Sequence, residues 1–344
     1  MSAANAARLR YWSVLTPMPA PELVATARMM EDAGIDGLFS PQVLGPPWIP
    51  LAAAAAVTDR VLLGSGIAIA AARSPFETAT AALDMDRLSG GRFVLGLGTS
   101  VLAWTKGVFG NPATKQVSHL RETVAAIRHI VAGGHKGLAP FEGEFYRADF
   151  RELQPLAPPV REKIPIWIAA LRSKMLHLAA EIGDGLVGHP MWSIEWTLEH
   201  MKPEFEAALA AAGRKREDVE VNLWYWAAPG DDEKQALEDS RPTMAFYGGI
   251  AQYEPFFEAH GYGDVAKKLQ VAVQSGDYRR AASLVPDEMV RTFVATGDAE
   301  AVRARFARVA GFADSLCVVP PSYALPAEKI MGYGMGIAAA LYGR

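Results

Sequence analysis

The segment Leu88-Ser89-Gly90-Gly91-Arg92-Phe93-Val94-Leu95-Gly96-Leu97-Gly98 decides the fold that the sequence predicts. It ends a helical pattern at a Ser-Gly-Gly stop and continues at once into the apolar run 93–98, which has no alternating polar positions. Such a run is typical of a parallel strand that is buried on both faces. The order of helix, glycine stop and buried strand predicts an α/β protein.

The same alternation of buried strand and helix recurs on both sides of this segment. Further strands are expected at residues 11–15, 35–40, 60–68, 164–170, 184–188, 219–226 and 315–319. Helices are expected at residues 21–33, 76–88, 118–132, 173–182, 194–212 and 326–342, with an Ala-rich helix after Pro50. Eight strands with intervening helices predict a (β/α)8 TIM barrel of the α/β class, and a doubly wound open sheet is the less favoured alternative.

The length of 344 residues allows two domains, but the strand count favours a single domain over residues 1–344. A plain barrel needs only about 250 residues. The surplus falls at approximately residues 135–163 and 232–308. We expect these insertions at the C-terminal face of the barrel, where they cover a pocket and select the substrate.

Composition excludes several classes of protein. The formal net charge is −4 and the basic residues are scattered, so neither a nucleic-acid partner nor a membrane partner is expected. Cys317 is the only cysteine, which excludes an internal disulfide and a cysteine-based zinc site. Its apolar surroundings predict a buried, inert thiol in a strand. No metal site, signal peptide or membrane span is expected, and we expect a cytoplasmic protein.

The ends of the predicted strands carry the candidate site, because barrels place their chemistry there. These ends hold small and aromatic residues and few carboxylates: Gly66-Ile67, Gly98-Thr99, Ala169-Ala170, Gly188-His189 and the run 224–226. This set favours a flat ring system that the backbone approaches closely, and it does not favour hydrolysis by paired acids.

Three further features at this end of the barrel are candidates for binding. Arg172-Ser173-Lys174 opens a predicted helix and could bind a phosphate group, although a solvated helix cap explains it equally well. His189 could donate to a carbonyl or carry a proton, and a structural histidine is the alternative. Three tryptophans in loops are candidates for the pocket wall, with ordinary loop packing as the alternative: Trp48, Trp104 and Trp192.

Several blocks of the sequence resemble the bacterial luciferase-like monooxygenase superfamily. The blocks are residues 60–67, 73–75, 88–98, 141–146, 164–170 and 179–186, and the likeness extends from about Trp12 to Val319. The chain is most similar to the branch of coenzyme F420-dependent oxidoreductases, such as methylenetetrahydromethanopterin reductase.

The resemblance implies a barrel that holds a deazaflavin, or FMN as the alternative, at its C-terminal mouth. It implies a non-prolyl cis peptide at Gly66-Ile67 behind the ring and places Gly98-Thr99 near the pyrimidine edge. Ala169-Ala170, with Arg172, Ser173 and Lys174, would hold the ribityl-phosphate tail, and Gly188 is a further cofactor-binding candidate. The resemblance also implies a homodimer that acts on a small-molecule substrate.

This chain departs from the family pattern at three places. Leu171-Arg172-Ser173 replaces a usual Gly-Pro after the fifth strand, Gln42-Val43 replaces an Asp-His pair, and Val101 replaces a Glu. Without that acid and base, alcohol oxidation is not expected. We therefore expect a hydride-transferring reductase with His189 and Gln42 as candidate catalytic residues. An FMN-dependent monooxygenase and an inactive cofactor-binding protein are the alternatives.

Overall fold

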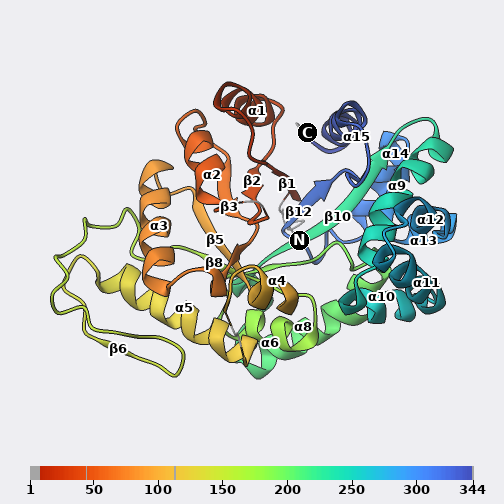
Figure 1. The fold of residues 1–344 in the computed structure, drawn as a ribbon. Coiled ribbons are helices and arrows are strands. Elements are labelled where there is room, and N and C mark those ends of the chain that lie inside the picture. Colours follow the sequence, from red (N-terminus) through yellow and green to blue (C-terminus); the bar gives the residue numbers. More distant parts are fainter. Residues whose placement is uncertain (1–7, 44, 112–113, 343–344) are drawn as a thin grey trace, which may run out of the picture. The chain divides into compact units, whose positions relative to one another are not determined.

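The computed structural model describes residues 8–43, 45–111 and 114–342, which form two compact units (Figure 1). The N-terminal unit comprises residues 12–187 and 204–222. The C-terminal unit comprises the described residues among 1–11, 188–203 and 223–344. Strands β1 (Arg10–Val14) and β10 (Glu220–Pro229) carry residues of both units. The expected single domain with two insertions stays a prediction.

The N-terminal unit is built on a parallel sheet. Its strands pair in the order β1, β2, β3, β5, β8, β9 and β10, so each strand lies beside the next strand of the main sheet along the chain. The bounds are β2 (Gly37–Ser40), β3 (Leu62–Ser65), β4 (Ala68–Ile69), β5 (Phe93–Gly98), β8 (Ile166–Ala169) and β9 (Gly185–Val187). Strand β4 pairs with β5 beyond the end of β3.

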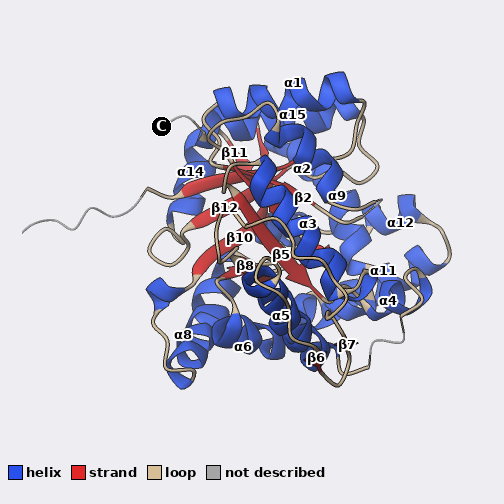
Figure 2. Ribbon diagram, turned by 90° about the vertical axis from the view of Figure 1, so that its left-hand side faces the viewer, coloured by secondary structure: helices blue, strands red, loops and turns tan. Residues whose placement is uncertain are grey.

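Helices pack against this sheet, as Figure 2 shows for α2 and α3 beside the strands. The helices are α1 (Ala20–Asp32), α2 (Trp48–Ala55), η1 (Ala70–Ala72), α3 (Pro75–Leu88), α4 (Leu102–Gly107), α5 (Gln116–Gly133), α6 (Ser173–Ile182), α8 (Lys202–Ala211) and η3 (Arg216–Asp218). The surplus segment 135–163 is largely irregular and contains the small antiparallel hairpin of β6 (Phe141–Glu142) and β7 (Arg147–Ala148).

The glycine stop between α3 and β5 works as the sequence predicts. Gly90 and Gly91 have φ angles of +63° and +86°, a conformation that glycine adopts without a steric penalty. Arg92 then fixes the start of the strand. Its guanidinium donates to the backbone oxygens of Thr58 and Val61, both at 2.7 Å, and so joins the beginnings of β3 and β5.

Aromatic rings from neighbouring strands form the centre of this unit. The Trp12 ring stacks on Phe39 with a centroid distance of 4.2 Å and lies 5.2 Å from the Trp167 ring. All three are almost fully buried. A Cβ atom on Gly37 would lie 2.3 Å from Trp12, and one on Gly185 would lie 2.3 Å from Trp167. Glycine at these two strand positions therefore makes the aromatic packing possible.

The C-terminal unit combines the end of β10, two further strands and most of the remaining helices. Strand β10 pairs in parallel with β11 (Val294–Gly297), and the Arg10 N–H donates to Asp314 O just before β12 (Ser315–Val319). The helices are α7 (Ile194–Trp196), η2 (Thr197–Met201), α9 (Glu233–Gly248), η4 (Ala251–Tyr253), α10 (Glu254–Ala259), α11 (Gly263–Gln274), α12 (Tyr278–Ser283), α13 (Asp287–Phe293), α14 (Ala299–Ala307) and α15 (Ala327–Leu341).

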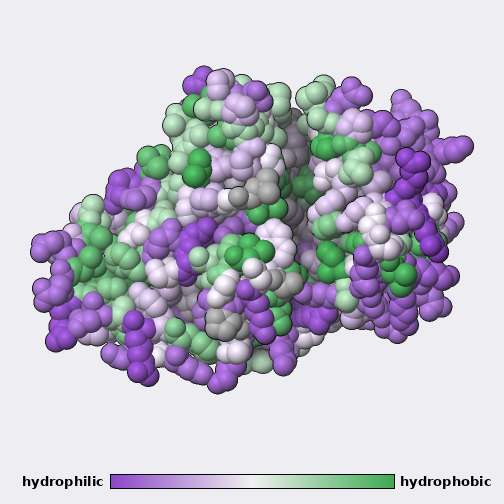
Figure 3. Space-filling model, viewed as in Figure 1, coloured by the Kyte–Doolittle hydropathy of each residue, from purple (hydrophilic) through white to green (hydrophobic). Residues whose placement is uncertain are grey.

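The surface and the core of this unit differ sharply in polarity. Hydrophilic residues predominate on the surface over α11 to α13 (Figure 3). In contrast, Cys317 is fully buried in β12, which confirms the predicted buried thiol in a strand, and burial raises its pKa. Within the described ranges, every helix is too short or too polar to cross a lipid bilayer.

Two predicted elements differ from the structure, and one strand is additional. The expected strand 60–68 is two strands, because the chain turns at Gly66-Ile67 between β3 and β4. The expected helix 194–212 contains the π-helical turn η2 between α7 and α8. Strand β11 was not expected, since its four residues lie among helices and its partner is distant in the sequence.

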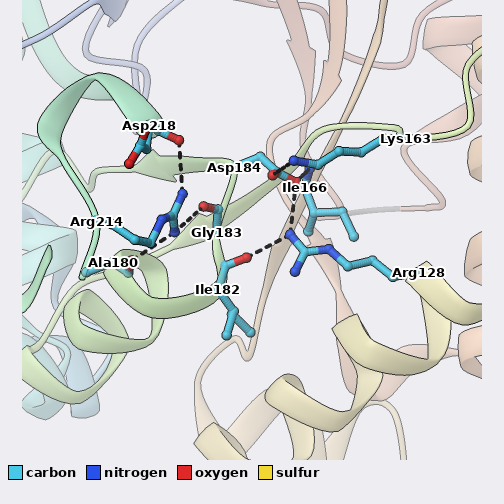
Figure 4. A network of polar contacts seen from close by, with 9 residues as sticks. All are labelled: Arg128, Lys163, Ile166, Ala180, Ile182, Gly183, Asp184, Arg214 and Asp218. Atoms are coloured by element: carbon cyan, nitrogen blue, oxygen red, sulfur yellow. Dashed lines mark hydrogen bonds and ion pairs between the residues drawn. The ribbon is translucent and has the colours of Figure 1, made fainter. Parts of the chain in front are cut away.

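A half-buried carboxylate joins several elements of the N-terminal unit (Figure 4). Asp184 accepts hydrogen bonds from Lys163 Nζ at 2.6 Å, Arg128 Nη2 at 3.0 Å and the Ile166 N–H at 3.0 Å. Arg128 also donates to Ile182 O at 2.7 Å. Burial opposes the ionisation of Asp184, but these three donors outweigh it and hold its pKa below 3.8.

Replacing Asp184 should therefore destabilise the protein in a pH-dependent way. We expect Asp184→Asn to lower the free energy of unfolding by about 1–2 kcal/mol at pH 7, because two cations lose their counter-charge. The depressed pKa means that this contribution is present above the unfolded-state pKa of about 3.9 and is lost as pH falls through the folded-state value. Urea unfolding at pH 7 and pH 3.5 measures the difference.

The exposed ion pair between Asp84 and Arg87 provides the control. Asp84→Asn should change the unfolding free energy by less than about 0.5 kcal/mol, since exposed pairs contribute little. If Asp184→Asn lowers the unfolding free energy as much at pH 3.5 as at pH 7, the result would contradict a charge-dependent role for Asp184.

Candidate functional site

The first part of the site lies in the N-terminal unit, where β3 ends. The peptide bond between Gly66 and Ile67 is cis, as the resemblance implied. The Gly66 N–H donates to Ser40 O at the end of β2, with an N–O distance of 2.9 Å. A Cβ atom on Gly66 would lie 2.7 Å from Phe39 Cβ, so a glycine is needed where this backbone crosses the aromatic core.

Gln42 holds the segment that follows the cis peptide. Its side-chain Oε1 accepts hydrogen bonds from the Ile69 N–H and from Arg73 Nη1, both at 2.9 Å. Its backbone N–H donates to Ile67 O at 3.3 Å. Gln42 is buried, and its amide oxygen is occupied by these two donors. These contacts fit a positioning residue, and the catalytic role expected for Gln42 stays a prediction.

Arg73 and Trp48 pack together beside this segment. The Arg73 guanidinium lies 5.5 Å from the centre of the Trp48 ring, and its Nε lies 3.3 Å from Glu77. Burial lowers the pKa of Arg73, although Glu77 counteracts this effect. The Trp48 ring also meets Phe93 edge to face at 6.2 Å. The contacts of the Trp48 ring with Arg73 and with Phe93 are both packing contacts within the protein. The substrate contact expected of Trp48 therefore stays a prediction.

The glycines at the end of β5 are buried and packed tightly against neighbouring segments. A Cβ atom on Gly96 would lie 2.0 Å from the backbone oxygen of Ser65, and one on Gly98 would lie 2.4 Å from Ile67 Cδ1. These glycines let β5 approach the chain around the cis peptide. Thr99 follows, and its backbone oxygen accepts a hydrogen bond from Thr105 Oγ1 at 3.1 Å. The ring of Trp104, in the short helix α4, lies 6.5 Å from the Phe109 ring.

The end of β8 leads into the N-terminus of α6. Ala169 ends the strand, and the Ala170 N–H donates to Val187 O at 3.0 Å. Arg172, Ser173 and Lys174 are exposed at the first turn of the helix, which has no side-chain cap. Among the described residues, nothing accepts a hydrogen bond from the Ser173 and Lys174 N–H groups. Free N–H groups at a helix N-terminus beside cationic side chains suit a phosphate group.

The second part of the site lies in the C-terminal unit, after β9. A Cβ atom on Gly188 would lie 3.1 Å from the Trp192 ring, and Trp192 is only 2% exposed. His189 is half-buried between Tyr247 and Tyr253, with ring centroids at 6.1 Å and 5.2 Å. Burial lowers the pKa of His189 to about 4. The imidazole is therefore neutral at pH 7. Of the two roles expected for His189, this favours hydrogen bonding over proton transfer.

The tyrosines around His189 were not found from the sequence. Tyr247 and Tyr253 belong to the surplus segment 232–308, and Tyr323 follows β12. They meet through the fold, because more than sixty residues of chain separate Tyr253 from His189 and Tyr323. The sequence indicated Arg73 only as part of a block that resembles the family. Its contacts with Gln42 and Trp48 were not predicted, because they join separate segments of the chain. A local pattern contains no signal for such clusters.

No metal centre accompanies either part of the site. In the portion of the chain that the structure describes, no group of three or more His, Cys, Asp or Glu residues is placed to hold a metal ion. The candidate residues themselves offer backbone groups, a helix N-terminus, an imidazole and phenol hydroxyls.

Comparison with known proteins gives this geometry a family context. The sequence profile described as "Luciferase-like monooxygenase" matches residues 3–315, which is most of the chain. The chain belongs to this family. The family resemblance in the sequence is thereby confirmed.

Two curated relatives and one solved structure are particularly informative. A Mycobacterium tuberculosis protein named "Putative coenzyme F420-dependent oxidoreductase" is 34% identical over 317 residues, or 87% of this chain and 90% of that protein. The 5,10-methylenetetrahydromethanopterin reductase of Archaeoglobus fulgidus is 30% identical over 249 residues, or 70% of each chain. The coenzyme F420-dependent tetrahydromethanopterin reductase of Methanopyrus kandleri matches with a TM-score of 0.80 at 22% identity, over 97% of this chain and 99% of that one.

The structural match confirms the predicted fold. The luciferase-like protein described here is a (β/α)8 barrel of the α/β class, and its eight predicted strands correspond to β1, β2, β3, β5, β8, β9, β10 and β12. The Mycobacterium tuberculosis relative and the Methanopyrus kandleri structure are both named as dependent on coenzyme F420.

Crowding at Gly96 should make this glycine essential for stability. We expect Gly96→Ala to lower the free energy of unfolding by about 3 kcal/mol, because the new methyl group meets the rigid Ser65 carbonyl. Gly332→Ala is the matched control in helix α15, where a Cβ meets nothing within 4 Å. It should be neutral or stabilise by up to about 1 kcal/mol. Equal stability of the two variants in chemical denaturation would contradict the predicted crowding.

Burial of His189 should make folding stability depend on pH. The unfolded chain protonates this histidine near pH 6.5 and the folded chain only near pH 4, so stability should fall as pH drops through this interval. We expect the wild type to lose about 2–3 kcal/mol relative to His189→Gln between pH 7 and pH 4.5. NMR should show an imidazole that does not titrate between pH 8 and pH 5. A midpoint near 6.5 in the folded protein would contradict the burial.

Proposed function

We propose that this protein is an F420-dependent reductase that transfers a hydride between the C5 atom of the deazaflavin and a small organic substrate. The observation that carries the proposal is the 34% identity, across 87% of the chain, to a relative named for coenzyme F420. The partial exposure of Gly66, Ile67 and Thr99 at the ends of β3 and β5 supports it, since a bound ring needs accessible backbone and small side chains.

The residues at the strand ends fit this cofactor. Gly66, Ile67, Gly98 and Thr99 would contact the ring. The exposed first turn of α6, with its two free N–H groups, would bind a phosphate of the tail. Ala169 and Ala170 would let the tail approach the backbone, and Gly188 is a further candidate contact. When bound, the deazaflavin supplies or accepts the hydride, and the protein positions the reactants.

The residues present favour a reductase over an alcohol dehydrogenase. Removing the proton of an alcohol needs a base near neutral pKa. The Oε1 of Gln42 is occupied by Ile69 and Arg73, Val101 has no titratable group, and His189 is a weak base in its buried setting. Hydride addition to an activated double bond has less need for such a base. The alternative is an FMN-dependent monooxygenase, which the family description favours.

Cofactor binding tests the proposal directly. The purified protein should retain F420 on gel filtration and should not retain FMN. Lys174→Ala should weaken F420 binding about 3- to 10-fold, with a larger effect at low salt, because it removes a cation beside the free N–H groups of α6. Absorbance titration measures both affinities.

Lys268→Ala, at an exposed position of α11, is the matched control and should bind F420 like the wild type. Retention of FMN, together with oxygen consumption by its reduced form, would overturn the proposal in favour of the monooxygenase.

A further inference from the structure

The C-terminal unit contains a cluster of three tyrosines and one histidine, which we call the tyrosine cluster: His189, Tyr247, Tyr253 and Tyr323. The Tyr247 ring lies 5.5 Å from Tyr253 and 6.0 Å from Tyr323, centroid to centroid. The residues come from the ends of β9 and β12 and from helices in between, so only the folded chain assembles them.

The hydrogen bonds of His189 determine its tautomer. The Met191 N–H donates to Nδ1 at 3.2 Å, so Nδ1 is an acceptor. In a neutral imidazole the proton is then on Nε2. The Tyr253 hydroxyl lies 3.4 Å from Nε2 and accepts that proton as a hydrogen bond. As a result, the hydroxyl hydrogen of Tyr253 points away from His189 and is available to another acceptor.

The other two hydroxyl groups of the tyrosine cluster are also available. Among the described residues, none forms a hydrogen bond with the hydroxyl of Tyr247 or Tyr323. Tyr323 is 37% exposed, so the tyrosine cluster is open to solvent at this residue. Phe246 stacks on Tyr323 at 3.8 Å, and Trp226 meets Tyr247 edge to face at 4.8 Å, so both phenol rings are held in place.

The tyrosine cluster has no charged component. Burial alone lowers the pKa of His189, and burial followed by the neighbouring Tyr323 raises the pKa of Tyr253 to about 12. Burial also raises the pKa of Tyr247, with further contributions only from Tyr323 and Tyr253. A charged ligand would lose its hydration here without gaining a counter-charge. An uncharged ligand with an oxygen acceptor has no such cost.

We propose that the tyrosine cluster binds an uncharged carbonyl compound, whose oxygen accepts a hydrogen bond from the Tyr253 hydroxyl. Tyr253 is the binding residue, and His189 is a positioning residue that orients its hydroxyl. The ring of Tyr247, which is partly exposed, would contact the apolar body of the ligand. In taking this ligand to be the substrate of hydride transfer, the inference rests on the proposed function.

The test uses 2-cyclohexen-1-one as the probe and the full chain, with and without F420. Ligand-observed NMR measures its affinity, and infrared spectroscopy measures its carbonyl stretch in the complex. Binding should shift the stretch to lower wavenumber, as hydrogen bonding to the oxygen does. Cyclohex-1-ene-1-carboxylate, which has a similar ring but is charged, should bind at least tenfold more weakly.

Variants separate the roles of the residues. Tyr253→Phe should abolish the infrared shift and weaken binding about fivefold, whereas Tyr278→Phe, at an exposed position of α12, should change neither. His189→Leu should also lose the shift. His189→Gln should keep it, because an amide N–H can replace Nε2–H, and a purely structural role would not produce this rescue. Tyr323→Phe, at a partly exposed position, should fold normally and weaken binding without removing the shift.

The outcomes distinguish this inference from the proposed function. An unchanged carbonyl stretch in Tyr253→Phe, or equal affinity for the carboxylate, would overturn the inference even if F420 binds. If the shift depends on Tyr253 but the protein does not bind F420, the carbonyl site stands and the proposed reductase function fails.

Discussion

Close packing between aromatic rings and glycine backbone is the constraint on which the N-terminal unit depends. Trp12 and Phe39 fill the space between neighbouring strands, and a Cβ atom on Gly37 or Gly66 would overlap them. Because protein interiors are as dense as organic crystals, such contacts leave the strands little freedom to shift. They fix where β3 ends and the cis peptide lies, and Gly96 fits β5 against the same turn. The position of the Gly66-Ile67 turn is thus a consequence of how the core is packed.

The candidate residues of the two units offer different chemistry. In the N-terminal unit, free backbone N–H groups and exposed cations at α6 suit an anionic group. In the C-terminal unit, uncharged hydroxyl groups around His189 suit an uncharged one.

Burial changes the roles that residue types alone would indicate. A histidine after a strand end and a polar residue at a family acid position both look catalytic in the sequence. In the fold, Gln42 is occupied by Ile69 and Arg73, and His189 is held neutral beside Tyr253. Both now resemble residues that orient their neighbours. The difference arises because pKa and hydrogen bonding depend on groups that are distant in sequence and close in space.

The sequence by itself determined the parts of this protein that local patterns encode. The apolar run 93–98, the glycine stop before it and the repeated strand and helix pattern were enough to predict the barrel, and the family blocks located Gly66-Ile67. Only the tertiary structure decided which side chains meet: Arg73 with Gln42, Asp184 with Lys163, and three tyrosines with His189. Periodicity reports which face of an element is buried, but contacts between distant segments arise only when the chain packs.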